Sequence, residues 1–343
     1  MATSFTLQAA LKDVFLPASL TTSLPVFRPQ QVFLLAFLVS AMRITIVPAG
    51  PKTSAATIRR LLQEAPTDVD VYGIYRNLSK VPADFGFHEN FHAVYGDVED
   101  ASSLDVGGSD AVMTSTPPFL TGEDPFVKAE QVSRNVRDAI ERAGGVKRLM
   151  LLSSLGAEFE QGVGEIKTNH IAEKILQNTN VPEILFVRCA YFMENWTLFN
   201  SQTLKGPEPY FNSVITPLEF QLPMVAVEDI GSTFAAELLS AHAPPSKPYV
   251  FALHGPREYS PLDVQVAFSK AMEKQVAVKA IAKDEMADFF SALFPPSLVG
   301  IWVEMSSSFL PGGIASPGSE GLENLDIVRG QVGLEKAIQD GSN

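Results

Sequence analysis

The chain has 343 residues, of which 46% are hydrophobic and 19% charged, a balance that excludes the disordered and fibrous classes. Its 39 acidic and 26 basic residues give a formal charge of -13, which repels phosphate backbones and anionic lipid, so we expect no nucleic-acid partner. The single cysteine, Cys189, allows no internal disulfide, which fits a reducing compartment and favours a cytoplasmic location. The five histidines are scattered, and we expect no metal site.

Residues 1–41 are poor in charge and end in an apolar run, Val32–Val39. This run is far shorter than the roughly 20 residues that span a bilayer, so we expect no stable membrane insertion. We interpret residues 1–41 as an N-terminal extension, either disordered or an artefact of the gene model, with Met42 as the working start. A signal anchor or an organelle presequence is the alternative.

From Arg43 onward, short β-branched runs alternate with helical stretches, the pattern of βαβ units that feed a parallel sheet. We expect strands at 43–47, 69–75, 91–97, 111–115, 147–154, 183–188 and 249–253, and helices at 54–64, 125–143, 167–178 and 261–274. The sequence therefore predicts an α/β fold with a doubly wound parallel sheet, a Rossmann-like dinucleotide-binding domain over 42–196. Residues 197–343 are expected to form a small α+β substrate lobe that returns strands to the sheet.

Ligands of such sheets bind beyond the carboxyl ends of the strands. The first of these ends is followed by Pro48-Ala49-Gly50-Pro51-Lys52-Thr53-Ser54, where prolines and a serine stand at the positions of the usual glycines. Prolines donate no N–H, so the turn keeps Gly50, Lys52, Thr53 and Ser54 to hold a pyrophosphate. The altered turn either binds the cofactor with a changed cradle or has lost it.

Arg76 follows the second strand, where the adenosine ribose of a dinucleotide lies. An arginine there suits a 2′-phosphate and favours NADP over NAD, whereas a solvated surface arginine is the plainer alternative. By position at the same sheet edge, we expect four further residues to bind the cofactor, namely Asp97, Thr116, Pro117 and Ser153.

The order and spacing of these segments resemble the NmrA-like family of atypical short-chain dehydrogenases. The resemblance starts near Arg43, and its most specific pieces are Lys167-Thr168-Asn169-His170-Ile171-Ala172-Glu173 and Phe192-Met193-Glu194-Asn195. It implies a Rossmann-type domain that binds NADP and a small lobe that forms the substrate pocket. It also implies one of two activities: an oxidoreductase, many of which act in fungal secondary metabolism, or a redox-sensing regulator without catalysis.

Ordinary short-chain dehydrogenases use a Tyr-x-x-x-Lys pair, and Lys167 matches its lysine, which would hold the nicotinamide ribose. Val163 stands where the tyrosine would be. Reduction of an iminium needs no proton donor, whereas a C=C or C=O bond needs one, for which we consider His170 and Tyr191. His170 and Glu173 share a helix face at i, i+3, which favours a structural hydrogen bond over an acid–base pair.

These observations predict an NADPH-dependent oxidoreductase that reduces a C=N, C=C or C=O bond of a hydrophobic small molecule. Phe289, Phe290, Phe294 and Trp302 suit an apolar lid over that molecule, or simply a core. Two alternatives stay open: a non-catalytic NADP(H) sensor with a protein partner, and a pocket that no longer binds dinucleotide.

Overall fold

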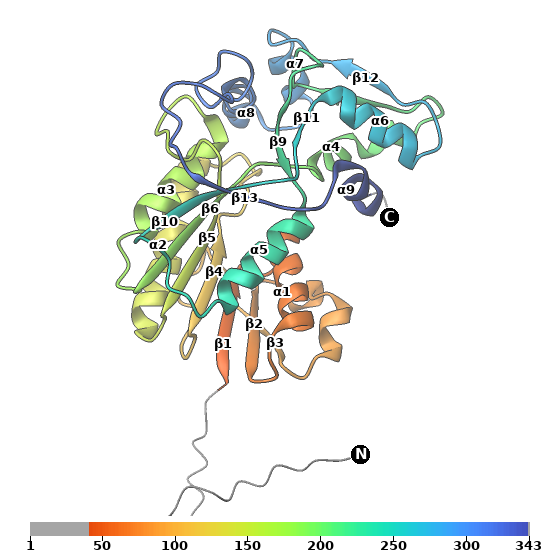
Figure 1. Ribbon diagram of the computed structural model, residues 1–343. Helices are drawn as coiled ribbons and strands as arrows, with labels where there is room; N and C mark the ends of the chain where they lie inside the picture. Colours follow the sequence, from red (N-terminus) through yellow and green to blue (C-terminus); the bar gives the residue numbers. More distant parts are fainter. Residues whose placement is uncertain (1–40, 342–343) are drawn as a thin grey trace, which may run out of the picture. The chain divides into compact units, whose positions relative to one another are not determined.

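The structure, a computed structural model, describes residues 41–341 (Figure 1). Residues 1–40, which make up nearly all of the predicted N-terminal extension, lie outside the described residues. Within residues 41–341, eight parallel strands form the main sheet, in the order β13-β10-β6-β5-β4-β1-β2-β3. They are β1 (Met42–Val47), β2 (Val69–Tyr75), β3 (Phe91–Tyr95), β4 (Ala111–Ser115), β5 (Arg148–Ser154), β6 (Glu183–Cys189), β10 (Tyr249–His254) and β13 (Asp326–Arg329). This arrangement confirms the predicted Rossmann-like α/β fold.

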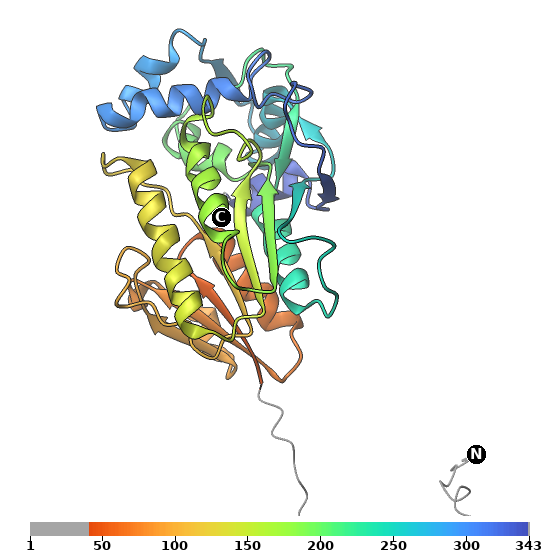
Figure 2. The same cartoon turned by 90° about the vertical axis from the view of Figure 1, so that its left-hand side faces the viewer.

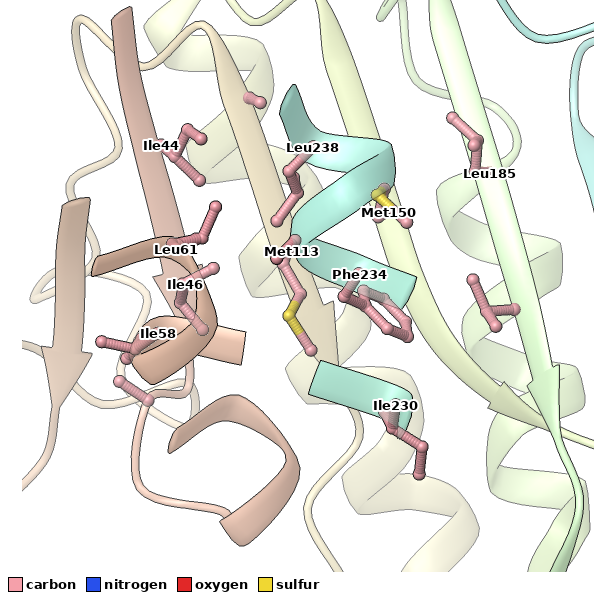
Figure 3. Packing of buried hydrophobic residues seen from close by; sticks show 14 of the residues in the cluster. Ile44, Ile46, Ile58, Leu61, Met113, Met150, Leu185, Ile230, Phe234 and Leu238 are labelled. Atoms are coloured by element: carbon pink, nitrogen blue, oxygen red, sulfur yellow. The ribbon is translucent and has the colours of Figure 1, made fainter. Parts of the chain in front are cut away.

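Two pairs of helices cover the two faces of this sheet. Helices α1 (Lys52–Glu64) and α5 (Val227–Leu239) pack on one face, where Ile58, Leu61 and Phe234 are buried with strand residues (Figure 3). Helices α2 (Pro125–Ala143) and α3 (Lys167–Leu176) lie side by side on the other (Figure 2). Each helix buries an apolar stripe against the sheet, so the core consists of two layers.

Glycine allows the close approach of α1 to α5. A Cβ placed on Gly231 would lie 2.7 Å from the backbone carbonyl carbon of Ala56, closer than packed atoms come. Because α1 begins at the turn after β1, this packing fixes the start of α1 against the start of α5. The contact therefore sets the geometry of the turn that carries the predicted cofactor residues.

The remaining elements build a third hydrophobic cluster around Trp196, Phe211 and Phe268. They are β7 (Tyr191–Phe192), α4 (Asn195–Leu204), β8 (Tyr210–Ser213), β9 (Leu222–Val225), β11 (Glu258–Tyr259), α6 (Pro261–Ala271), β12 (Ala277–Ala280), α7 (Met286–Ser291), α8 (Pro296–Ser308) and α9 (Leu334–Gly341). Three short 3-10 helices interrupt the earlier loops: η1 (Leu78–Lys80), η2 (Ala83–Phe87) and η3 (Gly164–Ile166). Within the described part of the chain, no helix is long and apolar enough to cross a membrane.

Most predicted boundaries agree with these elements within one or two residues, and three differences have local causes. The third strand ends at Tyr95 because Asp97 forms a turn, accepting the Glu99 amide at 3.0 Å. The helix from Lys167 ends at Leu176, where the Asn178 side chain donates to the Lys174 carbonyl at 2.7 Å. The helix from 261 ends at Ala271, and Glu273 soon follows with a positive φ of 51°.

Candidate functional site

The predicted cofactor residues lie where β1 lies between β2 and β4, the switch point at which the strand order reverses. A dinucleotide lies across this crevice in doubly wound sheets. Helix α1 begins at Lys52, and its first backbone bond inside the turn runs from the Ala55 amide to the Pro51 carbonyl at 2.9 Å. Among residues 41–341, no acceptor takes the amides of Lys52, Thr53 and Ser54.

These amides fit a phosphate despite the missing glycines. Gly50 is exposed, and a Cβ placed on it would meet nothing within 4 Å, so the turn leaves open space in front of the helix. Lys52 is exposed and adds a positive charge, whereas the side chains of Thr53 and Ser54 are buried. The helix dipole and the free amides favour an anion here, so the turn still fits a phosphate with prolines at 48 and 51.

Two hydroxyls on the neighbouring strands are buried without a hydrogen-bond partner among the described residues. Ser115 Oγ ends β4 and Tyr75 Oη ends β2, and neither has a hydrogen-bond partner within residues 41–341. Burial raises the pKa of Tyr75 to about 12, and the charge of Asp84 adds to this, so the hydroxyl stays protonated. Buried polar groups without a partner are uncommon and mark places that a ligand or water completes.

Neither Ser115 nor Tyr75 is among the cofactor residues predicted from the sequence. The predicted residues beside Ser115 are Thr116 and Pro117, which are half-buried immediately after β4. The signal that could have found Ser115 is a small hydroxyl residue at the end of a fully buried strand, directly beside β1 in the expected order.

Arg76 is exposed at the end of β2, and its guanidinium has no ion pair or hydrogen bond within the described residues. Asn77 caps the following 3-10 helix by accepting the Ser79 amide at 2.9 Å, which fixes the backbone next to the arginine. Asp97 lies beyond β3 and uses one carboxylate oxygen for its own turn, as described above. Arg76 is therefore available to an anion, whereas Asp97 already has a structural contact.

Lys167 is the first residue of α3, and its Nζ lies 5.2 Å from the centre of the Phe126 ring at the start of α2. Val163, at the position of the expected tyrosine, is fully buried. Between them, burial raises the pKa of Glu165 to about 7, although a 3.4 Å bond from the Thr168 hydroxyl lowers it. The residues around Lys167 thus contain a carboxyl group that is half protonated near neutral pH.

The expected hydrogen bond between His170 and Glu173 does not form. His170 Nδ1 lies 2.8 Å from the Ala157 carbonyl oxygen, and because a carbonyl only accepts, the imidazole donates there. Glu173 turns to the sheet, where it accepts the Ser153 hydroxyl at 2.6 Å and two nitrogens of Arg188 at 3.0 and 2.8 Å. The hydroxyl of Ser153, predicted to contact cofactor, is therefore engaged in this buried network.

Arg188 also forms ion pairs with two further carboxylates, those of Glu158 at 3.2 Å and Glu323 at 2.8 Å. Burial lowers the pKa of Arg188, but the hydrogen bonds to Glu173 and the charges of the three carboxylates raise it by more. The pKa is raised overall, so the guanidinium stays charged. Because Glu323 precedes β13, the network ties the C-terminal part of the chain to the centre of the sheet. Its role is structural.

Tyr191 lies at the edge of the third hydrophobic cluster, with its ring centre 5.7 Å from that of Trp196 and 6.3 Å from that of Phe309. Burial raises the pKa of Tyr191 well above the usual range for tyrosine, so it stays protonated. The aromatic residues expected in a lid do gather, since Phe294 stacks on Trp302 at 4.3 Å and Phe290 lies 6.0 Å from it. Phe290 is buried, whereas Phe289, Phe294 and Trp302 are only partly so.

Helix α8, which carries Trp302, touches the Rossmann-like part at two places (Figure 2). Gly164 in η3 has a φ of 53°, and a Cβ on it would overlap the Ile301 carbonyl and the Met305 amide. Ser297 Oγ donates to the Gly122 carbonyl at 3.0 Å, in the loop after β4. Helix α8, and with it Trp302, is thereby held beside η3, which directly precedes α3 and Lys167.

Residues 49–198 match the family model described as NAD(P)H-binding. The chain contains an NAD(P)H-binding domain. The matched range runs from the first turn through α3 to the segment after β6, so it includes most of the predicted site residues. A comparison with curated proteins gives no match.

Solved structures share the fold at low sequence identity. A triphenylmethane reductase from Citrobacter sp., complexed with NADP(H), is 18% identical with a TM-score of 0.63 and covers 87% of this chain and 99% of its own. An NADPH-dependent quinone oxidoreductase from Escherichia coli, complexed with NADPH, is 16% identical with a TM-score of 0.65, over 88% and 100%. NmrA, a negative transcriptional regulator, is 17% identical with a TM-score of 0.54, over 70% and 74%. The NAD(P)H-binding domain and the fold shared with NmrA agree with the resemblance drawn from the motifs.

Proposed function

We propose that the protein is an NADPH-dependent oxidoreductase that reduces a C=N, C=C or C=O bond of a hydrophobic small molecule. The observation that carries this proposal is the unpartnered polar groups around the end of β1: the amides that open α1, Ser115 Oγ and the Arg76 guanidinium. They support binding of a pyrophosphate at α1 and of a 2′-phosphate at Arg76. The two reductase structures in complex with NADP(H) or NADPH agree with this choice of cofactor.

The nicotinamide, when bound, would supply a hydride to the substrate. Lys167 would hold the ribose, and the partly buried rings of Phe294 and Trp302 would exclude water and bind an apolar substrate. An iminium substrate needs no proton from the protein, because the amine product is neutral as formed. For a C=C or C=O bond, the Glu165 carboxyl is a better proton donor than Tyr191, because its pKa of about 7 is close to working pH.

His170 is a weaker candidate for the proton donor than the sequence suggested. Its Nδ1–H is occupied by the Ala157 carbonyl, so a neutral imidazole presents only the acceptor Nε2. We also propose that residues 42–196 form the dinucleotide-binding domain and that residues 197–343 form the substrate lobe. The same proposal includes a role in secondary metabolism and a cytoplasmic location.

The direct test is consumption of NADPH, followed by absorbance, with cyclic iminium, enone and quinone substrates. We expect turnover with at least one class and a loss of about 10²–10⁴-fold in kcat for Lys167→Ala. The matched control is Lys174→Ala, since Lys174 is an exposed lysine on the last turn of the same helix. Equal turnover in all three proteins would contradict the role of Lys167.

A second candidate is a non-catalytic NADP(H) sensor that binds a protein partner. The missing tyrosine at Val163 and the shared fold with the regulator NmrA favour it. A sensor binds NADP+ and NADPH with different affinities and gains or loses its partner accordingly, without consuming NADPH. Tight dinucleotide binding with no turnover on any substrate class would favour this candidate. No dinucleotide binding at all would leave a repurposed pocket.

A further inference from the structure

Glu194 lies between the starts of α1 and α5. Its Oε1 accepts the amide of Val227, the first residue of α5, at 2.9 Å. Its Oε2 is buried and has no hydrogen-bond partner within residues 41–341. Lys52, in the first turn of α1, is near enough to interact with the carboxyl electrostatically. Because α5 and α1 pack together near their starts, the unpartnered oxygen lies close to the proposed phosphate site.

The charges around this carboxyl oppose one another. Burial raises the pKa of Glu194; the amides of Val227 and of Glu194 itself and the Lys52 ammonium lower it, and Asp229 on α5 raises it again. Asp229 is itself held in place, because its two oxygens accept the amides of Gln331 and Val332 at 3.0 and 2.9 Å. Helix α4, which starts directly after Glu194, has no charged residue. Lys52 is therefore the cation that balances Glu194.

A bound dinucleotide changes that balance. Its pyrophosphate at the amides of α1 would take the charge of Lys52 for itself and bring negative charge toward Glu194. An ionised carboxylate would then be buried without a cation, which costs several kcal/mol, and a protonated carboxyl avoids this cost. In the protonated form, the Oε2–H is free to donate to a phosphate oxygen, while Oε1 keeps its bond to the Val227 amide.

We propose that the dinucleotide binds together with one proton, taken from solvent onto Oε2 of Glu194. This inference rests on the proposed function, since it concerns the same phosphate site. It makes cofactor affinity depend on pH through a residue outside the first turn, and it gives Glu194 a role in cofactor binding that packing alone does not require.

The test is calorimetric titration of the full chain with NADPH between pH 5 and 9, in pairs of buffers that differ in ionisation enthalpy. We expect wild-type protein to take up more protons than Glu194→Gln, with a difference approaching one. The Kd of wild-type protein should rise with pH by at most about tenfold per unit, the limit for a single proton. Glutamine mimics the protonated carboxyl, so Glu194→Gln should bind at every pH about as wild type does at low pH.

Glu228→Gln is the matched control. Glu228 lies on the first turn of α5, next to Val227, but it is exposed and paired with Lys336. Glu228→Gln should behave as wild type. The NADPH 2′-phosphate also titrates in this pH range, but it does so equally with all three proteins and therefore cancels in the comparison. ADP-ribose, which has the pyrophosphate but no 2′-phosphate, gives a second test on wild-type protein that needs no variant. Equal proton uptake by wild type and Glu194→Gln, or no uptake with ADP-ribose, overturns this inference while leaving NADPH binding intact. Absence of all dinucleotide binding overturns the proposed function as well.

Discussion

Two arginines lie near the carboxyl ends of strands of the same sheet, and they differ in burial and in their partners. Arg76, after β2, is exposed and has no partner within residues 41–341. Arg188, near the end of β6, is buried and bonded to three carboxylates. A guanidinium that the protein satisfies completely has a structural role, whereas one left open at the ligand edge of the sheet is available to an anion.

Removal of Arg188 should have the largest effect. Arg188→Ala leaves Glu173 and Glu158 buried without their cation, so we expect a loss of about 3–5 kcal/mol in the free energy of unfolding. Urea denaturation measures it. Glu323 is half exposed, so Glu323→Ala serves as the milder comparison and should cost well under half as much. A stable Arg188→Ala protein that binds NADPH poorly would reverse the roles assigned to the two arginines.

The half-buried Glu165 should make stability depend on pH. Folding raises its pKa to about 7, so its contribution to stability is fully present below the unfolded pKa, near 4.5, and is lost as pH rises through 7. Glu165→Gln should therefore match wild type near pH 4.5 and be more stable by up to about 3 kcal/mol at pH 8. Groups with lowered pKa, such as Asp110 and Asp263, affect both proteins equally. Denaturation curves that stay parallel across this pH range would show that Glu165 does not titrate as described.

Arg76→Ala should weaken NADPH binding by about 10–100-fold and leave NADH binding unchanged, because a charge-assisted bond to the 2′-phosphate contributes about 1.5–3 kcal/mol. Its free energy of unfolding should change by no more than about 0.5 kcal/mol, as expected for an exposed side chain without partners. Lys80→Ala, an exposed cation four residues on, is the control. Equal losses of affinity for NADPH and NADH would show that Arg76 does not bind the 2′-phosphate.

Ser115→Ala should have the smallest effect and the most unusual sign. Its hydroxyl is buried without a partner, so its removal relieves a desolvation cost and should stabilise the apoprotein by about 0.5–1 kcal/mol. The same change should weaken dinucleotide binding several-fold. Thermal unfolding with and without NADPH measures both effects in one series. Destabilisation of the apoprotein would mean that the hydroxyl has a partner inside the fold.

The sheet could be predicted from the sequence because its signals are local. Strands 111–115 and 69–75 and the helix 125–143 were placed to the residue, since buried β-branched runs and the Asp124 and Gly144 caps mark them. Six short strands escaped prediction, because their pairing depends on distant segments and not on periodicity: β7, β8, β9, β11, β12 and β13, the last an edge strand of the main sheet.

The candidate site could be predicted only in part, because it depends on which polar groups find partners. The spacing of His170 and Glu173 places them about 60° apart around the helix, and that angle is enough to turn one toward Ala157 and the other toward the sheet. The bonds of Glu173 to Ser153 and Arg188 join three separate elements, so no local pattern contains them. The open hydroxyl of Ser115 is equally invisible, since residue type does not reveal a missing partner.

The central claim is that the glycine-poor turn after β1 still binds a dinucleotide. Calorimetric titration of the full chain with NADPH, NADP+ and NADH tests it most directly. We expect NADPH to bind with micromolar affinity, clearly more tightly than NADH. No heat of binding with any of the three, from protein that is folded by circular dichroism, would contradict it.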